Sequence, residues 1–424
     1  MSVTVETSDS KKRRFDAPPS PVEIAAIPYD LIIDILSRIP VKSLLRFKCV
    51  CKSWKTLISD TQFAKFHFQR SITDSTFTHH RLMPQACFLR DDIVSCSVES
   101  LLNDYDVIPE SLGYPLHPHY DVVGYRNGLC CLMYNREKVR LWNPCTKLVS
   151  PESPSLFNRD GPNRKTVFGF GYDESSNTYK VVSFFVDHYG KSLGSVFSFG
   201  SENCNWRQVH GFPDVTPEWG KSGECARGTL NWLAKAPLPG GMRNDKYYVI
   251  VSFDLGNETC REFLLPHDID RSCSVGTTFG VLRDCLCVSQ NYELTNFIVW
   301  QMMEHGVKES WTRLLNISYV DLGLKVYAFL EPLCMSEKGD ILMNTNIEEC
   351  KVVLYNPGDN RLTAWSFKDK KMIGMCQITA LIPLSSSFPV LARPSLTPSR
   401  PQTFHLMQCA IELVLSQYLL GQAV

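Results

Sequence analysis

Two short patterns in this 424-residue chain contain residue types that carry out catalysis in other proteins. Residues 190–194, Gly-Lys-Ser-Leu-Gly, match the Gly-x-Ser-x-Gly pattern, in which a serine nucleophile lies on a turn between a strand and a helix. Residues 195–199 have the composition of a strand instead, so we predict a hairpin turn and no nucleophile. Gly-Lys-Ser at 190–192 and 220–222 resembles the end of a phosphate-binding loop. Both segments lack the earlier glycine that such a loop needs.

Histidine and cysteine are the remaining candidates, as metal ligands. The histidine pairs at 79–80 and 117–119 have no carboxylate or cysteine cluster at ligand spacing, so we interpret them as solvated loop residues. A copper site of the galactose-oxidase type needs Tyr, His and Cys, and Tyr247, Cys260 and His267 show no recognisable arrangement. The 17 cysteines include no Cys-x-x-Cys pair and indicate reduced, mostly buried thiols. We predict no catalytic residue, no metal and no cofactor.

The composition argues against several classes of partner. Lys plus Arg and Asp plus Glu both number 44, so the chain lacks the positive charge of a dedicated nucleic-acid binder. Residues 1–20 are polar and contain no signal-peptide core. The apolar run at 404–420 contains His, Gln and Glu and is shorter than the roughly 20 residues of a membrane span. We expect no membrane partner and a location in the cytoplasm and/or nucleus.

The residues that favour a function lie near the N-terminus and favour protein binding. Pro28 suits the start of a helix because it has no N–H to leave unpaired, and Pro40 ends that helix. From Leu31 to Ile39, six of nine residues are aliphatic, which covers more than one stripe of the helix. A helix with so much apolar surface must bury it against other elements.

Two further helices follow within residues 41–60. The third places Val50, Trp54, Leu57 and Ile58 at i, i+4, i+7 and i+8, and we expect Trp54 to lie in the core of the unit. A unit of roughly 40 residues is near the lower size limit for independent folding. Its surplus apolar surface therefore predicts contact with the rest of the chain or with another protein.

From about residue 75 the pattern changes to short strands separated by Gly, Asn, Asp and Pro. Small turn residues open similar strands at steps of 49, 51, 56 and 55 residues, and they are Gly128, Asn177, Gly228, Asp284 and Gly339. Kelch-type propeller blades repeat at about 50 residues. A closed ring of four-stranded blades also leaves few raw sheet edges. We predict about six blades.

Both regions resemble one known family. Residues 27–54, Ile-Pro-x-Asp-Leu-Ile-x-x-Ile-Leu-Ser-Arg-Ile-Pro through Cys-Val-Cys-Lys-Ser-Trp, resemble an F-box. It is most similar to those of the plant group in which an F-box precedes an F-box-associated propeller. Asn127-Gly-Leu-Cys, Phe168-Gly-Phe-Gly-Tyr-Asp and Gly228-x-Leu-Asn-Trp-Leu are similar, in this order, to that second domain. The resemblance implies an F-box docked on a Skp-family adaptor, which links it to a cullin and the ubiquitin-loading machinery.

What the resemblance implies for this chain is a receptor without catalytic residues. Propeller loops would hold an unknown protein substrate for ubiquitination and proteasomal degradation. The alternative is a module that sequesters a partner without causing its turnover. The matching family positions give the adaptor-docking face, which we expect to be exposed: Pro28, Leu31, Ile32, Ile35, Leu36, Leu44 and Leu45.

The predicted fold class is therefore an α+β multidomain chain with a small helical F-box and an all-β propeller. The expected segments are a disordered tail (1–22), the F-box (23–70), the propeller (75–385), a linker (386–403) and a candidate helix (404–421). The family resemblance fades after about residue 385.

Overall fold

The structure is a computed structural model of the 424-residue chain. It describes residues 27–39, 41–73, 80–84, 94–98, 110–112, 120–144, 147–157, 166–187, 189, 191–201, 205–218, 221–240, 246–266, 269, 277–292, 295–320, 330–336, 339–345, 351–366 and 376–380. The tail, linker and C-terminal helix predicted from the sequence lie outside the described residues.

Four helices form the N-terminal unit: α1 (Tyr29–Ser37), α2 (Val41–Phe47), α3 (Lys52–Ser59) and α4 (Thr61–Thr73). As the sequence predicts, α1 begins directly after Pro28, whose carbonyl accepts hydrogen bonds from the N–H groups of Leu31 and Ile32. The carboxylate of Asp60 accepts from the N–H groups of Gln62 and Phe63, and so caps the start of α4. No helix among the described residues is long and apolar enough to span a membrane.

The core of the helical unit is aliphatic and is shared by its helices. Leu36, Leu44, Leu57, Ile58 and Phe63 are buried together, from α1, α2, α3 and α4. The rings of Phe47 and Trp54 meet edge to face at the margin of this core, with centroids 5.7 Å apart. A small unit thus gains its stability from a few residues contributed by every helix.

Twenty-four strands follow, and the described residues form six sheets. The blades are numbered here by their position along the chain, and each is given from its innermost strand outward. Blade 1 is β24 (Cys376–Ala380), β1 (His80–Pro84), β2 (Val94–Ser97) and β3 (Glu110–Ser111); blade 2 is β4 (Tyr120–Arg126), β5 (Leu129–Tyr134) and β6 (Lys138–Trp142); blade 3 is β7 (Val167–Asp173), β8 (Thr178–Val186), β9 (Ser192–Ser198) and β10 (Arg207–Val209). Blade 4 is β11 (Thr216–Pro217) with β12 (Glu224–Ala226), then β13 (Thr229–Pro237), β14 (Lys246–Asp254) and β15 (Cys260–Leu264); blade 5 is β16 (Thr278–Leu282), β17 (Cys285–Tyr292), β18 (Asn296–Met302) and β19 (Trp311–Ser318); blade 6 is β20 (Leu330–Met335), β21 (Ile341–Thr345), β22 (Lys351–Asn356) and β23 (Arg361–Ser366). This is a six-bladed propeller, as predicted.

The ring is closed by both ends of the propeller sequence. In blade 1 the late strand β24 pairs with the early strand β1, with Ala380 opposite His80 and Cys376 opposite Pro84. The innermost strands of successive blades lie next to one another around the ring, and β24 lies between β20 and β4. No local repeat in the sequence marks this closure, because it joins segments almost 300 residues apart.

The repeat residues found in the sequence all lie in one structural position. Gly128, Asn177, Gly228, Asp284 and Gly339 have positive φ angles between 54° and 93°, each in the turn that joins the innermost strand of a blade to the next strand. Left-handed backbone favours Gly, Asn and Asp, which is why the repeat is visible as small residues. The period predicted from the sequence is therefore the period of these turns.

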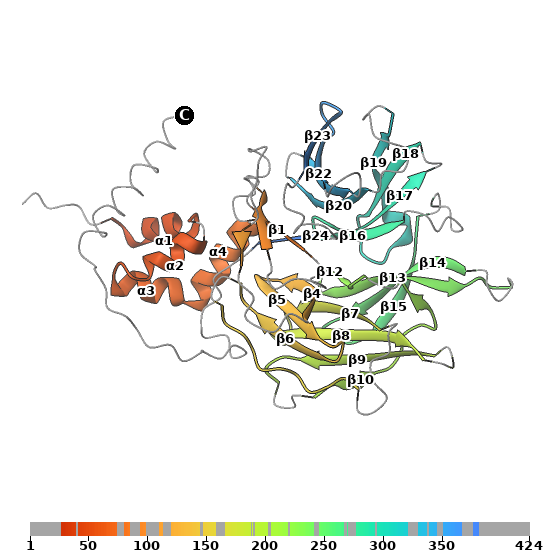
Figure 1. The fold of residues 1–424 in the computed structure, drawn as a ribbon, viewed down its shortest axis with the longest axis horizontal. Helices are drawn as coiled ribbons and strands as arrows, with labels where there is room; N and C mark the ends of the chain where they lie inside the picture. The colour runs from red at the N-terminus through yellow and green to blue at the C-terminus, as the bar shows by residue number, and fades with distance from the viewer. Residues whose placement is uncertain are drawn as a thin grey trace, which may run out of the picture.

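The two faces of the propeller differ in their relation to the helices. The turns just described lie on the face that we call the near face, because β1 begins there and α4 packs against β24. The opposite face, the far face, carries the connections between the second and third strands of each blade. Figure 1 shows the helical unit on one side of the propeller and the β13–β14 hairpin reaching away on the other.

Candidate interaction surfaces

The predicted docking residues divide into two groups in the structure. Pro28 and Leu31 are exposed, with Leu31 at 44%, and Ile32, Ile35 and Leu45 are half-buried. We call these five residues the apolar ledge. In Figure 1, α4 is the helix nearest the propeller, so the described blades do not cover α1. Among the described residues, the blades therefore leave the ledge uncovered.

Leu36 and Leu44 correct the expectation that all seven positions are exposed. Both side chains have no exposed surface and pack with Leu57, Ile58 and Phe63 in the core of the unit. Because these helices are apolar on most sides, their sequence shows no single apolar stripe that would mark the buried residues. Packing against the other helices decides which residues are buried. These two residues hold the docking helices in place from the inside.

Sequence reasoning missed three exposed apolar residues of the helical unit. Ile27, Tyr29 and Phe66 are 38%, 57% and 47% exposed. Tyr29 occupies an unspecified position of the F-box pattern. Phe66 lies one helical turn from the buried Phe63, so spacing alone places both on the same side of α4. Tyr29 extends the apolar surface at the start of α1.

A polar network fixes α1 against α4. Asp34 accepts hydrogen bonds from Arg38 at 3.0 Å on the same helix and from Arg70 on α4 at 2.6 Å. Arg70 also donates to the hydroxyl of Ser37. The hydrogen bond from Arg38, only partly opposed by burial, and the one from Arg70 hold the pKa of Asp34 below its usual value. The orientation of the ledge helix is thus set by charge-assisted bonds.

A buried histidine makes a second link between α4 and the end of α1. His67 has no exposed surface, and its Nε2 lies 3.0 Å from the carbonyl oxygen of Ile39. Burial lowers the pKa of His67, although the contact with Ile39 opposes this effect. The neutral ring, donating from Nε2, satisfies the carbonyl of Ile39, which lies two residues beyond the end of α1.

The chemistry-bearing patterns of the propeller have structural roles. Strands β8 and β9 pair from Val186 and Ser192 onward, which confirms the predicted hairpin across Gly190-Lys-Ser-Leu-Gly. Tyr247 lies on β14 and Cys260 on β15, and His267 lies outside the described residues. In the described part of the chain, no three His, Cys, Asp or Glu side chains form a metal-holding group.

The ten cysteines whose side chains the structure describes are free thiols, and most are buried or half-buried. Burial raises the pKa of Cys260 and of Cys287 to about 12. It also raises the pKa values of Cys131 and Cys225. A protonated, buried thiol is a poor nucleophile, so these cysteines act as small apolar core residues.

The Phe168–Asp173 motif supplies a buried ion pair that joins two blades. Lys180 lies 2.9 Å from Asp173 and 3.1 Å from Glu258, and donates to the carbonyl of Leu255 in blade 4. Burial alone would raise the pKa of Asp173, but hydrogen bonds from Ser175, Ser176 and Lys180 hold it well below its usual value. Asp173 also accepts a hydrogen bond from the N–H of Ser175, and this bond starts the turn between β7 and β8.

Exposed apolar side chains on the propeller gather at one face. Of the six large ones in the described propeller, only Met303 lies in a near-face turn. The other five lie at far-face ends of strands or in far-face loops of blades 3, 4 and 5: Tyr189, Leu238, Leu264, Tyr292 and Val320. Tyr189 and Val320 are 84% and 79% exposed. Exposed apolar residues mark an interaction site when they form one contiguous patch.

Comparisons with known proteins cover most of the chain. A family model described as the F-box associated beta propeller domain matches residues 79–387, and the F-box domain model matches residues 24–66. An F-box/kelch-repeat protein of Arabidopsis thaliana is 33% identical over 344 residues, which cover 79% of this chain and 89% of that protein. The F-box protein CPR1 of the same plant is 27% identical over 371 residues, covering 82% and 86%.

Proposed function

Because this chain belongs to the F-box proteins that carry an F-box-associated β-propeller, we propose that it is the substrate-recognition subunit of an SCF-type ubiquitin ligase. In this proposal the F-box binds a Skp-family adaptor and, through it, a cullin. The observation that carries the proposal is the apolar ledge, which lies on a small helical unit and is left uncovered by the described blades. Water-exposed aliphatic surface of this extent is stabilised by burial against a partner.

The receptor needs no catalytic group for this role. Ubiquitin transfer takes place at the loading enzyme, and the receptor raises the local concentration of a substrate lysine near the reactive thioester. Holding two reactants together converts a bimolecular encounter into an effectively unimolecular step. A rigid closed propeller joined to a compact helical unit suits this task because neither part loses much freedom on binding.

We assign target binding to the far face of the propeller. The helical unit attaches at the near face, so a target on the far face is not obstructed by the adaptor. Tyr189, Leu238 and Val320 supply exposed apolar contacts there, on connections between strands of a rigid scaffold. Tyrosine is also enriched among residues that dominate binding energy.

A pair of matched variants tests both halves of the proposal. Leu31→Glu combined with Ile35→Glu is expected to weaken adaptor binding by about 30-fold or more, since loss of a central apolar contact costs about 2 kcal/mol or more. Tyr189→Glu combined with Leu238→Glu introduces the same charge on the far face and should leave adaptor binding unchanged. Surface plasmon resonance against the purified adaptor measures both. Unchanged adaptor binding by the ledge variant contradicts the docking assignment.

The same variants distinguish degradation from sequestration. Targets are identified by co-purification from plant tissue with the proteasome blocked. The far-face variant should lose the target and retain the adaptor, whereas the ledge variant should retain the target and lose the adaptor. We expect the target to accumulate when the proteasome is inhibited or when this protein is absent. A captured target whose level responds to neither treatment would contradict the receptor role and favour sequestration.

A further inference from the structure

The helical unit carries a positive charge that the rest of the chain balances. Residues 27–73 contain eight Lys or Arg residues against three Asp and no Glu, so the net charge of the unit is +5. Because Lys plus Arg and Asp plus Glu both number 44 in the whole chain, the remaining residues have a net charge of −5. Such an uneven distribution of charge along one chain favours a charged partner for the charged region.

The acidic residues of the helical unit lie outside α2 and α3. No Asp or Glu occurs between Asp34 and Asp60, a stretch that contains both helices. Asp34 pairs with Arg38 and Arg70, and Asp60 caps the start of α4. These two carboxylates therefore hold the unit together, and α2 and α3 have no acidic residue of their own.

Three lysines at the end of α2 and on α3 form what we call the basic cluster: Lys48, Lys52 and Lys55. Lys52 and Lys55 are exposed and three positions apart on α3, so they are neighbours on its surface. Burial lowers the pKa of Lys48, and the nearby charge of Lys55 lowers it further. Among the described residues, none of the three takes part in an ion pair. Their mutual repulsion is therefore left uncompensated by the described part of the chain.

The start of α3 adds a second unfavourable interaction. Lys52 is the first residue of this helix, and the first turn contains no acidic residue. The N-terminus of a helix carries partial positive charge and is stabilised by negative groups. A carboxylate supplied by a partner would reduce both the repulsion between the lysines and the repulsion between Lys52 and the helix end.

The basic cluster adjoins the apolar ledge. Lys48 follows the ledge residue Leu45 by three positions. The N–H groups of Cys49 and Val50 donate to carbonyl oxygens three residues earlier, so the helical path of α2 continues past Lys48. Residues three positions apart on such a path lie on the same side of it. In Figure 1 the helix nearest the propeller is α4 and not α3. A partner on the ledge is therefore brought next to these lysines.

We propose that the adaptor that covers the ledge presents an acidic segment to Lys48, Lys52 and Lys55. Charge attraction then guides the approach of the adaptor, and apolar contact on the ledge holds it. The inference rests on the proposed adaptor-binding function, and it adds the chemistry of the partner surface and the residues that meet it.

A protein segment suits the basic cluster better than nucleic acid or an anionic membrane. Nucleic-acid binding commonly neutralises about 6–10 phosphates, which is more than three lysines can do. A broad anionic surface would also be repelled by the remaining residues of the chain, whose net charge is −5. A short acidic segment contacts the helical unit alone and avoids this repulsion.

Lys52→Gln combined with Lys55→Gln tests the contribution of charge in the full-length protein. Surface plasmon resonance with the purified Skp-family adaptor as the probe measures the association rate. We expect it to fall at least about threefold at about 0.1 M salt, where charges act over about 10 Å. At about 1 M salt this distance is about 3 Å, and the variant should associate as fast as the original protein. Lys52→Arg combined with Lys55→Arg keeps both charges and should keep the original rate.

Lys191→Gln combined with Lys246→Gln is the matched control, because both lysines are exposed and lie on the propeller. It removes the same charge from the chain and should leave the association rate unchanged. An equal decrease in the two glutamine variants would show that net charge alone is responsible and would overturn the proposal. An unchanged rate and salt dependence in the basic-cluster variant would overturn it as well.

Carbodiimide cross-linking of the complex formed by the original protein tests direct contact without any substitution. The reagent joins an amine and a carboxylate that touch each other as an amide, and mass spectrometry identifies the two residues. We expect amides between the basic cluster and Asp or Glu residues of the adaptor. Cross-links to the adaptor that are confined to other lysines would overturn the proposal.

The ledge variant, Leu31→Glu with Ile35→Glu, separates failure of this inference from failure of the proposed function. If the ledge variant loses the adaptor and the basic-cluster variant associates normally, the docking face stands and the basic-cluster assignment is overturned. Absence of adaptor binding by the original protein would overturn both. Phosphatidylserine vesicles are the competing probe. Vesicle binding that requires Lys52 and Lys55, together with unchanged adaptor association, would assign the cluster to a membrane and overturn the proposal.

Discussion

The helical unit and the propeller differ in how completely they bury their apolar side chains. The propeller closes on itself, so its large apolar clusters lie between successive blades and are filled by its own side chains. The helical unit is too small to do this. It buries Leu36 and Leu44 and leaves the apolar ledge at its surface. The propeller therefore buries its apolar clusters by itself, whereas in the proposed function the helical unit buries its ledge against an adaptor.

The largest loss of stability is expected when the propeller ring can no longer close. A chain ended after residue 375 lacks β24, the innermost strand of blade 1, and leaves β1 without its partner on one side. We expect the cooperative thermal transition of the propeller to be lost, as followed by near-ultraviolet circular dichroism. An unpaired strand edge should also cause aggregation.

The matched control is a chain ended after residue 387, which keeps all of the residues that match the family model of the F-box-associated propeller. It should unfold like the full-length protein. If the chain ended at 375 unfolds with the same midpoint and cooperativity as this control, the propeller is stable as an open ring, and the contrast with the helical unit fails.

The next largest effect is a difference in stability between substitutions in the core of the helical unit and substitutions in the apolar ledge. Leu44→Ala removes a side chain with no exposed surface and should cost about 2–5 kcal/mol of stability. Leu31→Ala changes a residue that is 44% exposed, and should cost about 0.5 kcal/mol or less. Urea unfolding of the full-length protein, followed by the circular dichroism signal of the helices, provides the measurement. Equal costs for the two variants would remove the distinction between buried and exposed docking positions.

The smallest effect is a pH dependence confined to the helical unit. Burial holds the pKa of His67 below 6.5, whereas the unfolded chain titrates near 6.5. As the pH falls below 6.5, the unfolded state takes up a proton that the folded state does not, so stability declines until the folded pKa is reached. Thermal unfolding at pH 7.5 and pH 5.5 should show this loss in the helices.

His67→Gln should reduce that pH dependence, because glutamine does not titrate. His210→Gln is the control, since His210 is exposed on the propeller and should not alter the pH dependence of the helices. A helical transition that responds to pH equally in the original protein and in His67→Gln would show that another group is responsible.

The sequence predicted the turns, strands and helix starts that depend only on neighbouring residues. The left-handed turns at Gly128, Asn177 and Gly228 restrict residue type, so their spacing predicted the blades. Strands such as Lys351–Asn356 have a β-branched apolar composition that was visible without any knowledge of their neighbours. The start of α1 after Pro28 was likewise a local property.

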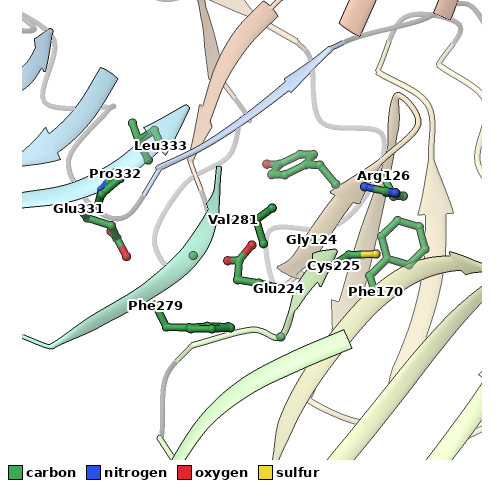
Figure 2. Close-up of a pocket in the computed structure, with 13 residues that line it drawn as sticks. Gly124, Arg126, Phe170, Glu224, Cys225, Phe279, Val281, Glu331, Pro332 and Leu333 are labelled. Atoms are coloured by element: carbon green, nitrogen blue, oxygen red, sulfur yellow. The ribbon is translucent and has the colours of Figure 1, made fainter. Parts of the chain in front are cut away.

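Features that depend on distant contacts could not be predicted. The pairing of β24 with β1 has no local signal, and the innermost strand of blade 4 is broken into β11 and β12. Leu36 and Leu31 are both aliphatic residues of one helix, and only the packing of α2, α3 and α4 separates them. Arg126 and Glu331 likewise line the same pocket at the centre of the propeller (Figure 2), although they lie more than 200 residues apart in the sequence.

The position of β24 has a consequence for the order of events during protein synthesis. The ribosome must make almost 300 residues after β1 before the strand that closes the ring exists. At about 5–20 residues per second, this takes roughly 15–60 s. The F-box helices are made before the blades, and in the proposed function they can bind an adaptor while the blades are still an open arc with an unpaired edge. Chaperones that shield such edges should therefore be required for the yield of this protein, and adaptor recruitment should precede the ability to select a target.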